Sequence, residues 1–332
     1  MSDTAYRIFG AELSPYSVKV RSYFRYKDIP HEWIVRGPAE METFSRYAKL
    51  PLIPLVVTPD DEGIQDSTPI IETMEAQIPE PSIHPDDPAA AFVSALVEEF
   101  GDEWGNKWMF HYRWAREADQ IAAAERLAAV MAPGATGDQL AGVVAGIQDR
   151  MVGRVWFVGS SESTAPIIED SFVRGLELLE PHLAGRPYLF GGRPAFGDFG
   201  LWGQLYNAWT DPTCGELIGA HAPSIVPWIE RMLAPEAEGG FEAWSDLAPT
   251  LAPFVSEMIG GYFLPWSDAN AKAIANGDET FSVDLHGRPY EQKPQKYHAR
   301  SLAALRQRYA GLADTSAVDP VLEQTGCLGW LR

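Results

Sequence analysis

The sequence predicts two domains, a small α/β sheet domain followed by an all-helical domain. Three observations lead to this fold class. The first eighty or so residues alternate short apolar strands with helices, the residues from about 87 to 248 carry helical patterns without strand-like alternation, and a proline-rich acidic segment separates the two parts. A chain of 332 residues with 46% hydrophobic residues is also long enough to build about two cores.

The first domain is expected to follow the order β-α-β-α-β-β-α. Strands are expected at 6–10, 31–35 and 55–58, with a short strand end at 64–65 after the turn signal at 59–63. Helices are expected from Ser14–Pro15 to about Tyr26, at about 39–48 and at about 68–77, the last with Ile70, Ile71 and Met74 on one face. This order is that of a small α/β sheet domain.

Residues 79–87 mark the domain boundary, because they carry three prolines and three acidic residues and are therefore typical of a solvated linker. We divide the chain into a sheet domain at 1–80, a linker at 81–87, a helical domain at 88–249 and a C-terminal extension at 250–332. Helices are expected at 88–117, 118–132, 138–152, 166–184, 196–210 and 224–233, with another at about 298–313 in the extension.

The composition excludes several classes of function. A formal net charge of -20 repels nucleic acid and anionic membranes, so neither is expected as a partner, and an anionic ligand needs a locally positive site. The two cysteines, Cys214 and Cys327, lack the spacing of a disulfide framework, zinc cluster or dithiol centre. There is no signal-peptide pattern, no apolar run of membrane-spanning length, no nucleotide-binding motif and no convincing set of metal ligands. We expect a cytoplasmic protein without a metal or nucleotide cofactor.

Ser14 and Pro15 directly follow the first strand. Pro15 suits the first helical position, and Ser14 suits the N-cap, where its hydroxyl meets free backbone N–H groups. A hydroxyl in this place could also hydrogen-bond a thiolate. Lowering a thiol pKa from ~8.5 to ~7 needs roughly 2 kcal/mol, and one hydrogen bond to a charged acceptor gives about 1.5–3 kcal/mol. A simple helix cap and a thiol-stabilising group remain equally open on this motif alone.

Two further motifs flank the later strands. Pro54 either starts a strand or follows a cis bond that turns the Ile53 backbone outward, where its N–H and C=O could pair with an extended peptide. Asp66 and Ser67 precede a helix, where either residue could simply be a cap. Ser67 and the first free N–H groups of that helix could instead bind a carboxylate, and Asp66 could hold an ammonium. An α-amino acid end would satisfy both.

In this order and spacing, the three motifs over residues 5–78 resemble the N-terminal domain of the glutathione transferase superfamily. Residues 186–204 resemble the loop and Asp-containing helix start in the helical domain of that family. The resemblance implies a thioredoxin-like glutathione-binding domain and an all-α domain that supplies the pocket of the second substrate. It also implies a homodimer.

The resemblance implies a role for each matching residue. Ser14 matches the serine that activates the glutathione thiol, with Tyr6 and Tyr16 as reserve candidates. The cysteinyl part of glutathione is matched to Ile53 and cis-Pro54, the γ-glutamyl end to Asp66 and Ser67, and the glycyl carboxylate to Lys49, which is otherwise a solvated surface lysine. Asp198 matches a buried aspartate that caps a core helix.

The chain departs from the family pattern in two ways. Ala195 stands where the family usually has Ser or Thr three residues before the capping aspartate, so the capping box is incomplete. The chain is also longer than a typical member, with the surplus between about 118 and 165 and beyond 250. The extension, with Tyr290, Tyr297 and Tyr309, is expected to be a partner surface or a lid.

The second substrate is expected to contact the first long helix of the helical domain. Four residues at helical spacing could present an aromatic face to the cleft, or else form a core or dimer-contact stripe. These are Trp104, Trp108, His111 and Tyr112.

We therefore predict an enzyme that uses glutathione as a cosubstrate and directs its thiolate to an apolar, aromatic-type electrophile. Because no cysteine lies near the start of the first helix, conjugation, ether cleavage or isomerisation is favoured over disulfide reduction. The alternative is a non-catalytic binding or scaffold protein on the same fold.

Overall fold

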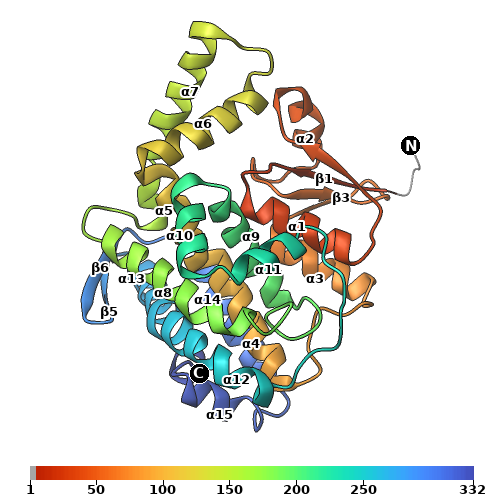
Figure 1. Cartoon of the computed structure of the whole chain (residues 1–332), viewed down its shortest axis with the longest axis vertical. Coiled ribbons are helices and arrows are strands. Elements are labelled where there is room, and N and C mark those ends of the chain that lie inside the picture. The colour runs from red at the N-terminus through yellow and green to blue at the C-terminus, as the bar shows by residue number, and fades with distance from the viewer. Residues whose placement is uncertain (1–4) are drawn as a thin grey trace.

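The computed structural model describes residues 5–332, in which a four-stranded sheet stands beside a larger group of helices (Figure 1). The sheet has the order β2-β1-β3-β4. Its strands are β1 (Tyr6–Gly10), β2 (His31–Val35), β3 (Leu55–Val57) and β4 (Gly63–Gln65). β1 pairs parallel to β2 and antiparallel to β3, which pairs antiparallel to β4.

Alternate residues of a strand point to opposite faces of the sheet, and here both sets are apolar. Helices therefore cover both faces. Ile8 and Val56 belong to the main core, which includes residues of α1 (Pro15–Tyr26) and α3 (Ser67–Gln77). Phe9, Leu55 and Val57 form a smaller core with Phe44 of α2 (Met41–Tyr47). The predicted β-α-β-α-β-β-α order is confirmed.

The helical domain is built around α9 (Phe196–Trp209), which packs on α1, α4 and α5. Close approach depends on glycine: a Cβ on Gly200 would lie 2.7 Å from the Cα of Glu98 in α4. The other helices are α4 (Pro88–Phe100), α5 (Asn106–Ala115), α6 (Glu117–Met131), α7 (Gly137–Val152), α8 (Ala165–Leu183), α10 (Pro212–His221) and α11 (Ile225–Arg231). Five predicted helices lie within two residues of α6, α7, α8, α9 and α11, whereas α10 was not predicted.

The single helix predicted over 88–117 is interrupted. A π-helical turn at Gly101–Gly105 separates α4 from α5. At this turn the chain passes against α9, since a Cβ on Gly101 would lie 2.6 Å from the backbone of Gly200 and Leu201. A π turn changes the direction of the side chains that follow it, so the apolar spacing of the sequence does not continue through it.

The surplus at 118–165 forms a helical hairpin of α6 and α7 that projects from the body of the molecule (Figure 1). Trp114, Ala124 and Ile147 are among the buried residues of its own small core. The end of α6 reaches the loop after β2, where a Cβ on Gly37 would lie 3.4 Å from the carbonyl oxygen of Val130.

The extension packs on the helical domain and shares its core, to which Phe254, Tyr290 and Leu302 contribute. It contains α13 (Leu264–Asn276), the hairpin β5 (Phe281–Leu285) and β6 (Arg288–Gln292), α14 (Ala299–Ala310), α15 (Asp319–Gln324) and α16 (Leu328–Leu331), preceded by α12 (Trp244–Phe254) and a π-helical segment at Val255–Phe263. Of these elements, only α14 was predicted. Among the described residues, no helix combines the length and apolarity needed to cross a membrane.

Candidate functional site

The three motifs of the first domain lie at one end of the sheet. Phe9 at the end of β1 lies opposite Leu55, which lies opposite Gln65 at the end of β4. Because neighbouring strands here are antiparallel, the segment after β1, the segment before β3 and the segment after β4 meet at this end. Ser14, Ile53 and Asp66 belong to these three segments.

Ser14 is the N-cap of α1, as predicted. Its Oγ accepts hydrogen bonds from the backbone N–H of Ser17 at 3.3 Å and from the Ser17 hydroxyl at 2.9 Å. Among the hydrogen bonds of residues 5–332, Ser14 Oγ acts only as an acceptor, so its own proton is available for a ligand. The side chain is half-buried at the domain boundary.

The loop that carries Ser14 is fastened to the helical domain. The carbonyl oxygen of Leu13 accepts a hydrogen bond from Arg113 at 3.1 Å, and Arg113 is itself held by Asp211 at 2.6 Å. Glu12 accepts a hydrogen bond from the hydroxyl of Tyr206 at 2.7 Å. These contacts fix the position of Ser14 relative to α5 and α9.

The Ile53–Pro54 bond is cis, which confirms the conformation expected from the resemblance. The preceding loop is held by the amide of Gln65, a residue to which sequence reasoning gave no role. Gln65 accepts hydrogen bonds from the N–H groups of Lys49 and Leu50 at 2.6 and 3.0 Å, and it donates to the carbonyl oxygens of Leu50 and Leu52, both at 2.9 Å. The Lys49 side chain is exposed on this loop.

Asp66 precedes α3 with a φ of 80°, an uncommon conformation for a residue other than glycine. Its carboxylate makes no capping bond and instead accepts a hydrogen bond from the hydroxyl of Tyr297 at 2.6 Å. Burial and this hydrogen bond raise the pKa of Tyr297 above its usual value, so its hydroxyl is a donor at neutral pH.

Ser67 points into a different environment from Asp66. Its hydroxyl is fully buried, donates to Asp102 at 3.3 Å and accepts from Lys19 at 3.4 Å. The first intrahelical bond of α3 runs from Ile70 N–H to Asp66 C=O, so the N–H groups of Ser67 and Thr68 come before the helical ladder. At this helix end, any contact of Ser67 with a ligand therefore depends on its backbone and not on its hydroxyl.

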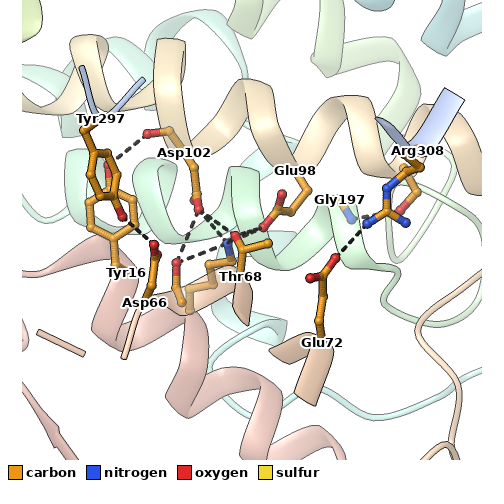
Figure 2. A network of polar contacts seen from close by, with 12 residues as sticks. Tyr16, Asp66, Thr68, Glu72, Glu98, Asp102, Gly197, Tyr297 and Arg308 are labelled. Atoms are coloured by element: carbon orange, nitrogen blue, oxygen red, sulfur yellow. Dashed lines mark hydrogen bonds and ion pairs between the residues drawn. The ribbon is translucent and has the colours of Figure 1, made fainter. Parts of the chain in front are cut away.

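A buried network of charges lies between α1, α3, α4 and the π turn (Figure 2). The ammonium of Lys19 contacts Glu98 Oε1 at 2.5 Å and Asp102 Oδ2 at 2.7 Å, and Thr68 donates to Glu98 at 2.6 Å. Burial raises the pKa of Asp102 to about 7, against the opposing effect of Lys19. Sequence reasoning missed this network, although Glu98 and Asp102 stand at i,i+4 spacing, which places them on one face of a helix.

A cavity of about 260 Å³ lies between α1, α3, the π turn and α14. Tyr16 of α1 lines this cavity, and its hydroxyl donates to the carbonyl oxygen of Asp102 at 2.8 Å. The hydroxyl of this reserve candidate for the thiol contact is therefore used in a structural hydrogen bond. Ser14 and Ser67 do not line it. The remaining lining residues include Asp66, Thr68, Glu72, Glu99, Glu103, Tyr297, Arg300, Ser301 and Arg308.

The four residues expected in the second-substrate pocket lie in the interior of the helical domain and are not brought together with Ser14. Trp104 and Trp108 are fully buried and donate to the hydroxyl of Ser171 at 3.1 and 2.7 Å. Tyr112 packs against Phe172 with ring centroids 5.3 Å apart. Helical spacing identified a shared face, but that face meets α8 and the extension rather than a cleft.

His111 is also buried and satisfied within the protein. One ring nitrogen lies 2.7 Å from the hydroxyl of Ser160, and the other lies 2.9 Å from Glu169. Burial lowers the pKa of His111. Its contacts are those of a packing histidine, which was the alternative left open by the sequence.

Lys107 is a buried cation that sequence reasoning did not identify. Its ammonium donates to the carbonyl oxygen of Val158 at 2.9 Å and lies 3.8 Å from the ring centroid of Trp266. It forms no ion pair with an acidic residue in the part of the chain that the structure describes, and burial lowers its pKa well below the usual value. Through Trp266 and Gln292, which it contacts at 3.3 Å, Lys107 joins the extension to the helical domain.

Asp198 is fully buried at the start of α9. It accepts hydrogen bonds from the N–H groups of Leu189 and Ala195 at 2.8 and 2.9 Å and from the indole of Trp228 at 2.9 Å. Ala195 has no side-chain acceptor to return, so only the aspartate half of a capping box is present. The role of Asp198 is therefore structural, as the resemblance implies.

The small mixed sheet, the cis proline and the helical domain together define the glutathione transferase architecture. Family models match the chain in both parts: the glutathione S-transferase N-terminal domain at residues 13–77 and the glutathione S-transferase C-terminal domain at residues 113–249. The chain belongs to the glutathione S-transferase family.

Solved structures similar to this chain include two bacterial glutathione S-transferases. The Methylobacterium radiotolerans protein, in complex with glutathione sulfonate, is 20% identical with a TM-score of 0.41, and the match covers 74% of this chain and 94% of that one. The Methylobacillus flagellatus protein, with glutathione bound, is 18% identical with a TM-score of 0.42, and the match covers 69% and 95%. The beta-etherase LigF from Sphingobium sp. strain SYK-6 is 15% identical with a TM-score of 0.46, and the match covers 69% and 95%. No curated protein matches the chain significantly.

Proposed function

We propose that this protein is a glutathione-dependent transferase or lyase that activates the thiol of glutathione for attack on an apolar electrophile. The observation that carries the proposal is the Ser14 hydroxyl, which caps α1 yet keeps its own proton free. Such a hydroxyl can donate to a thiolate held at the helix N-terminus, which itself favours negative charge. Family membership and the cis Ile53–Pro54 bond support the same site.

The energies involved are sufficient for thiol activation. One hydrogen bond to a charged acceptor is worth about 1.5–3 kcal/mol, and the helix terminus adds about 0.3–1 kcal/mol. Since each pKa unit corresponds to about 1.4 kcal/mol, the two effects can lower the thiol pKa by one unit or more. With its thiol pKa lowered from about 8.5 to about 7, about half of the glutathione bound beside Ser14 would be thiolate at neutral pH.

The other end of glutathione is assigned to the start of α3. Asp66 accepts the ammonium of the γ-glutamyl group, and the N–H groups of Ser67 and Thr68 receive its carboxylate. The backbone of Ile53 pairs with the cysteinyl part, and Lys49 on the adjoining loop is assigned to the glycyl carboxylate. With this assignment, the ammonium at one end of glutathione faces an acidic residue, and the carboxylate at the other end faces a lysine.

Conjugation, ether cleavage and isomerisation are the reactions we propose, because a serine and not a cysteine caps α1, and both cysteines of the chain are buried. The pocket for the electrophile is not assigned to Trp104, Trp108, His111 or Tyr112. A homodimer remains a prediction from the family resemblance. Light scattering, which gives the molar mass in solution, would test it.

The proposal is tested by the pKa of enzyme-bound glutathione, measured from the ultraviolet absorbance of the thiolate across pH. We expect the wild type to lower this pKa and Ser14→Ala to raise it again by about one unit or more, with glutathione still bound. Ser45→Ala, on the exposed face of α2, is the matched control and should behave as wild type. An unchanged thiol pKa in Ser14→Ala would exclude the assigned role.

A further inference from the structure

The C-terminal extension reaches back to the first domain and contacts the first two turns of α3. Tyr297, just before α14, donates to Asp66 Oδ2 at 2.6 Å, and Arg308 of α14 forms an ion pair with Glu72 at 2.8 Å (Figure 2). The extension therefore stands directly over the helix end at which the γ-glutamyl group is placed.

Between these two contacts lies the cavity of about 260 Å³, and Asp102, one of its lining residues, carries an unsatisfied acceptor. Asp102 is only 8% exposed, and its Oδ1 has no hydrogen-bond partner among residues 5–332, whereas its Oδ2 faces Lys19. A buried carboxylate oxygen without a partner is unfavourable unless a ligand or a water satisfies it. Because burial raises the pKa of Asp102 to about 7, this carboxyl is partly protonated at neutral pH, and the ammonium of a ligand in the cavity can take the place of that proton.

The charges around the cavity suit a group that carries both signs. Acidic residues predominate in its lining, with Asp66, Glu99 and Glu103 beside Asp102. Two arginines of α14 also line the cavity. Arg300 forms no ion pair with any described residue, whereas Arg308 forms an ion pair with Glu72. Acidic groups for an ammonium, together with a free guanidinium and the N-terminus of α3 for a carboxylate, match the α-amino acid end of a peptide.

Tyr297 determines how Asp66 faces this cavity. Its hydroxyl donates a hydrogen bond to Oδ2 of Asp66, and no described residue donates to Oδ1 of Asp66. A carboxylate held through one oxygen loses its freedom to rotate, so the other oxygen is presented in one orientation to a ligand. The ring of Tyr297 itself lines the cavity and is 48% exposed, so a ligand could contact it.

We propose that the C-terminal extension forms one wall of the thiol-peptide site, with Tyr297 as a positioning residue that holds Asp66 while the cavity between α3, the π turn and α14 receives the ammonium end of the peptide on Asp66 and Asp102. This inference rests on the proposed function. It adds that selectivity for a free α-amino group comes from a segment that lies 231 residues from Asp66 in the chain.

The test compares two ligands on the full-length protein by calorimetric titration: glutathione and its desamino analogue, glutaryl-cysteinylglycine. The variant is Tyr297→Phe, which removes only the hydroxyl. We expect it to weaken glutathione binding about tenfold and to leave binding of the desamino analogue unchanged. The matched control is Tyr309→Phe, since the hydroxyl of Tyr309 also lies in the extension but donates to Asp319, away from the cavity.

The outcomes separate this inference from the proposed function. If the wild type binds glutathione and Tyr297→Phe binds it equally well, the positioning role is overturned while the glutathione site stands. Equal weakening of both ligands, or tighter glutathione binding, would overturn it as well, because the hydroxyl would then be a general structural contact or an occluding group. If the wild type binds neither ligand, the proposed function itself fails.

Discussion

The hydroxyl of Tyr297 donates a hydrogen bond to the carboxylate of Asp66 at 2.6 Å, across 231 residues of sequence. This contact brings the C-terminal extension to the helix end at which the first domain is expected to hold glutathione. Beneath it, Lys19, Glu98 and Asp102 form a buried charge network that joins α1 to α4 and to the π turn.

Lys19 is predicted to be essential to stability. Lys19→Met leaves Glu98 and Asp102 buried without their cation, which should cost about 3–5 kcal/mol of unfolding free energy in chemical denaturation. Lys272→Met is the control, because that ammonium is exposed and pairs with Asp268 one helical turn away, so its loss should cost below about 1 kcal/mol. Similar, small losses in both variants would show that the network contributes little.

The stability of the protein should depend on the titration of Asp102. Its pKa of about 7 in the folded protein lies above its ordinary value of 3.8, so folding takes up a proton between these pH values. Its contribution is complete below about pH 4 and is lost as the pH rises through 7, at up to about 1.4 kcal/mol per pH unit. The unfolding free energy of Asp102→Asn should therefore fall less than that of the wild type as the pH rises from about 4 to 7. Parallel stability curves for the two proteins would contradict the assignment.

Gly200 is predicted to set the distance between α9 and α4. A Cβ at this position would lie 2.7 Å from the Cα of Glu98 and 2.8 Å from its carbonyl oxygen, and neither backbone atom can move freely. Gly200→Ala should lower the unfolding free energy by about 1–3 kcal/mol. The matched control is Gly219→Ala in α10, which meets no atom within 4 Å and should be neutral or stabilising. The prediction fails if both substitutions stabilise.

Gln65 is predicted to hold the loop that precedes the cis proline. Its side chain makes four hydrogen bonds to the backbone of Lys49, Leu50 and Leu52, so Gln65→Ala should speed amide hydrogen exchange at Lys49 and Leu50. We expect an increase of about tenfold or more, the effect of losing about 1.4 kcal/mol of local stability. Gln77→Ala, at the exposed end of α3, should leave these amides unchanged. Equal exchange in both variants would rule out the proposed role.

Local sequence patterns were sufficient to predict the first domain. Turn signals and short apolar runs placed its strands, and the segments around Ser14, Pro54 and Asp66 identified one end of the sheet, because antiparallel neighbours bring those segments together. The cis bond at Pro54 followed from the resemblance, since most bonds before proline are trans.

The interior of the helical domain and the extension could not be predicted in this way. Helical spacing shows that Trp104 and Trp108 share a face, but only the packing of α8 and the extension makes that face a core. No local sequence pattern indicates the contact between Asp66 and Tyr297. The same is true of the pairing of Lys19 with two carboxylates that lie about eighty positions away in the chain. Contacts of this kind depend on tertiary structure, which the periodicity of one segment does not encode.

The most direct test of the account is a calorimetric titration of glutathione into the wild-type protein at modest salt. We predict saturable binding with a dissociation constant in the micromolar-to-millimolar range, and loss of this binding on Asp66→Ala. If the wild type shows no binding, the account of a glutathione site is contradicted, and the same fold would have to serve as a non-catalytic binding or scaffold protein.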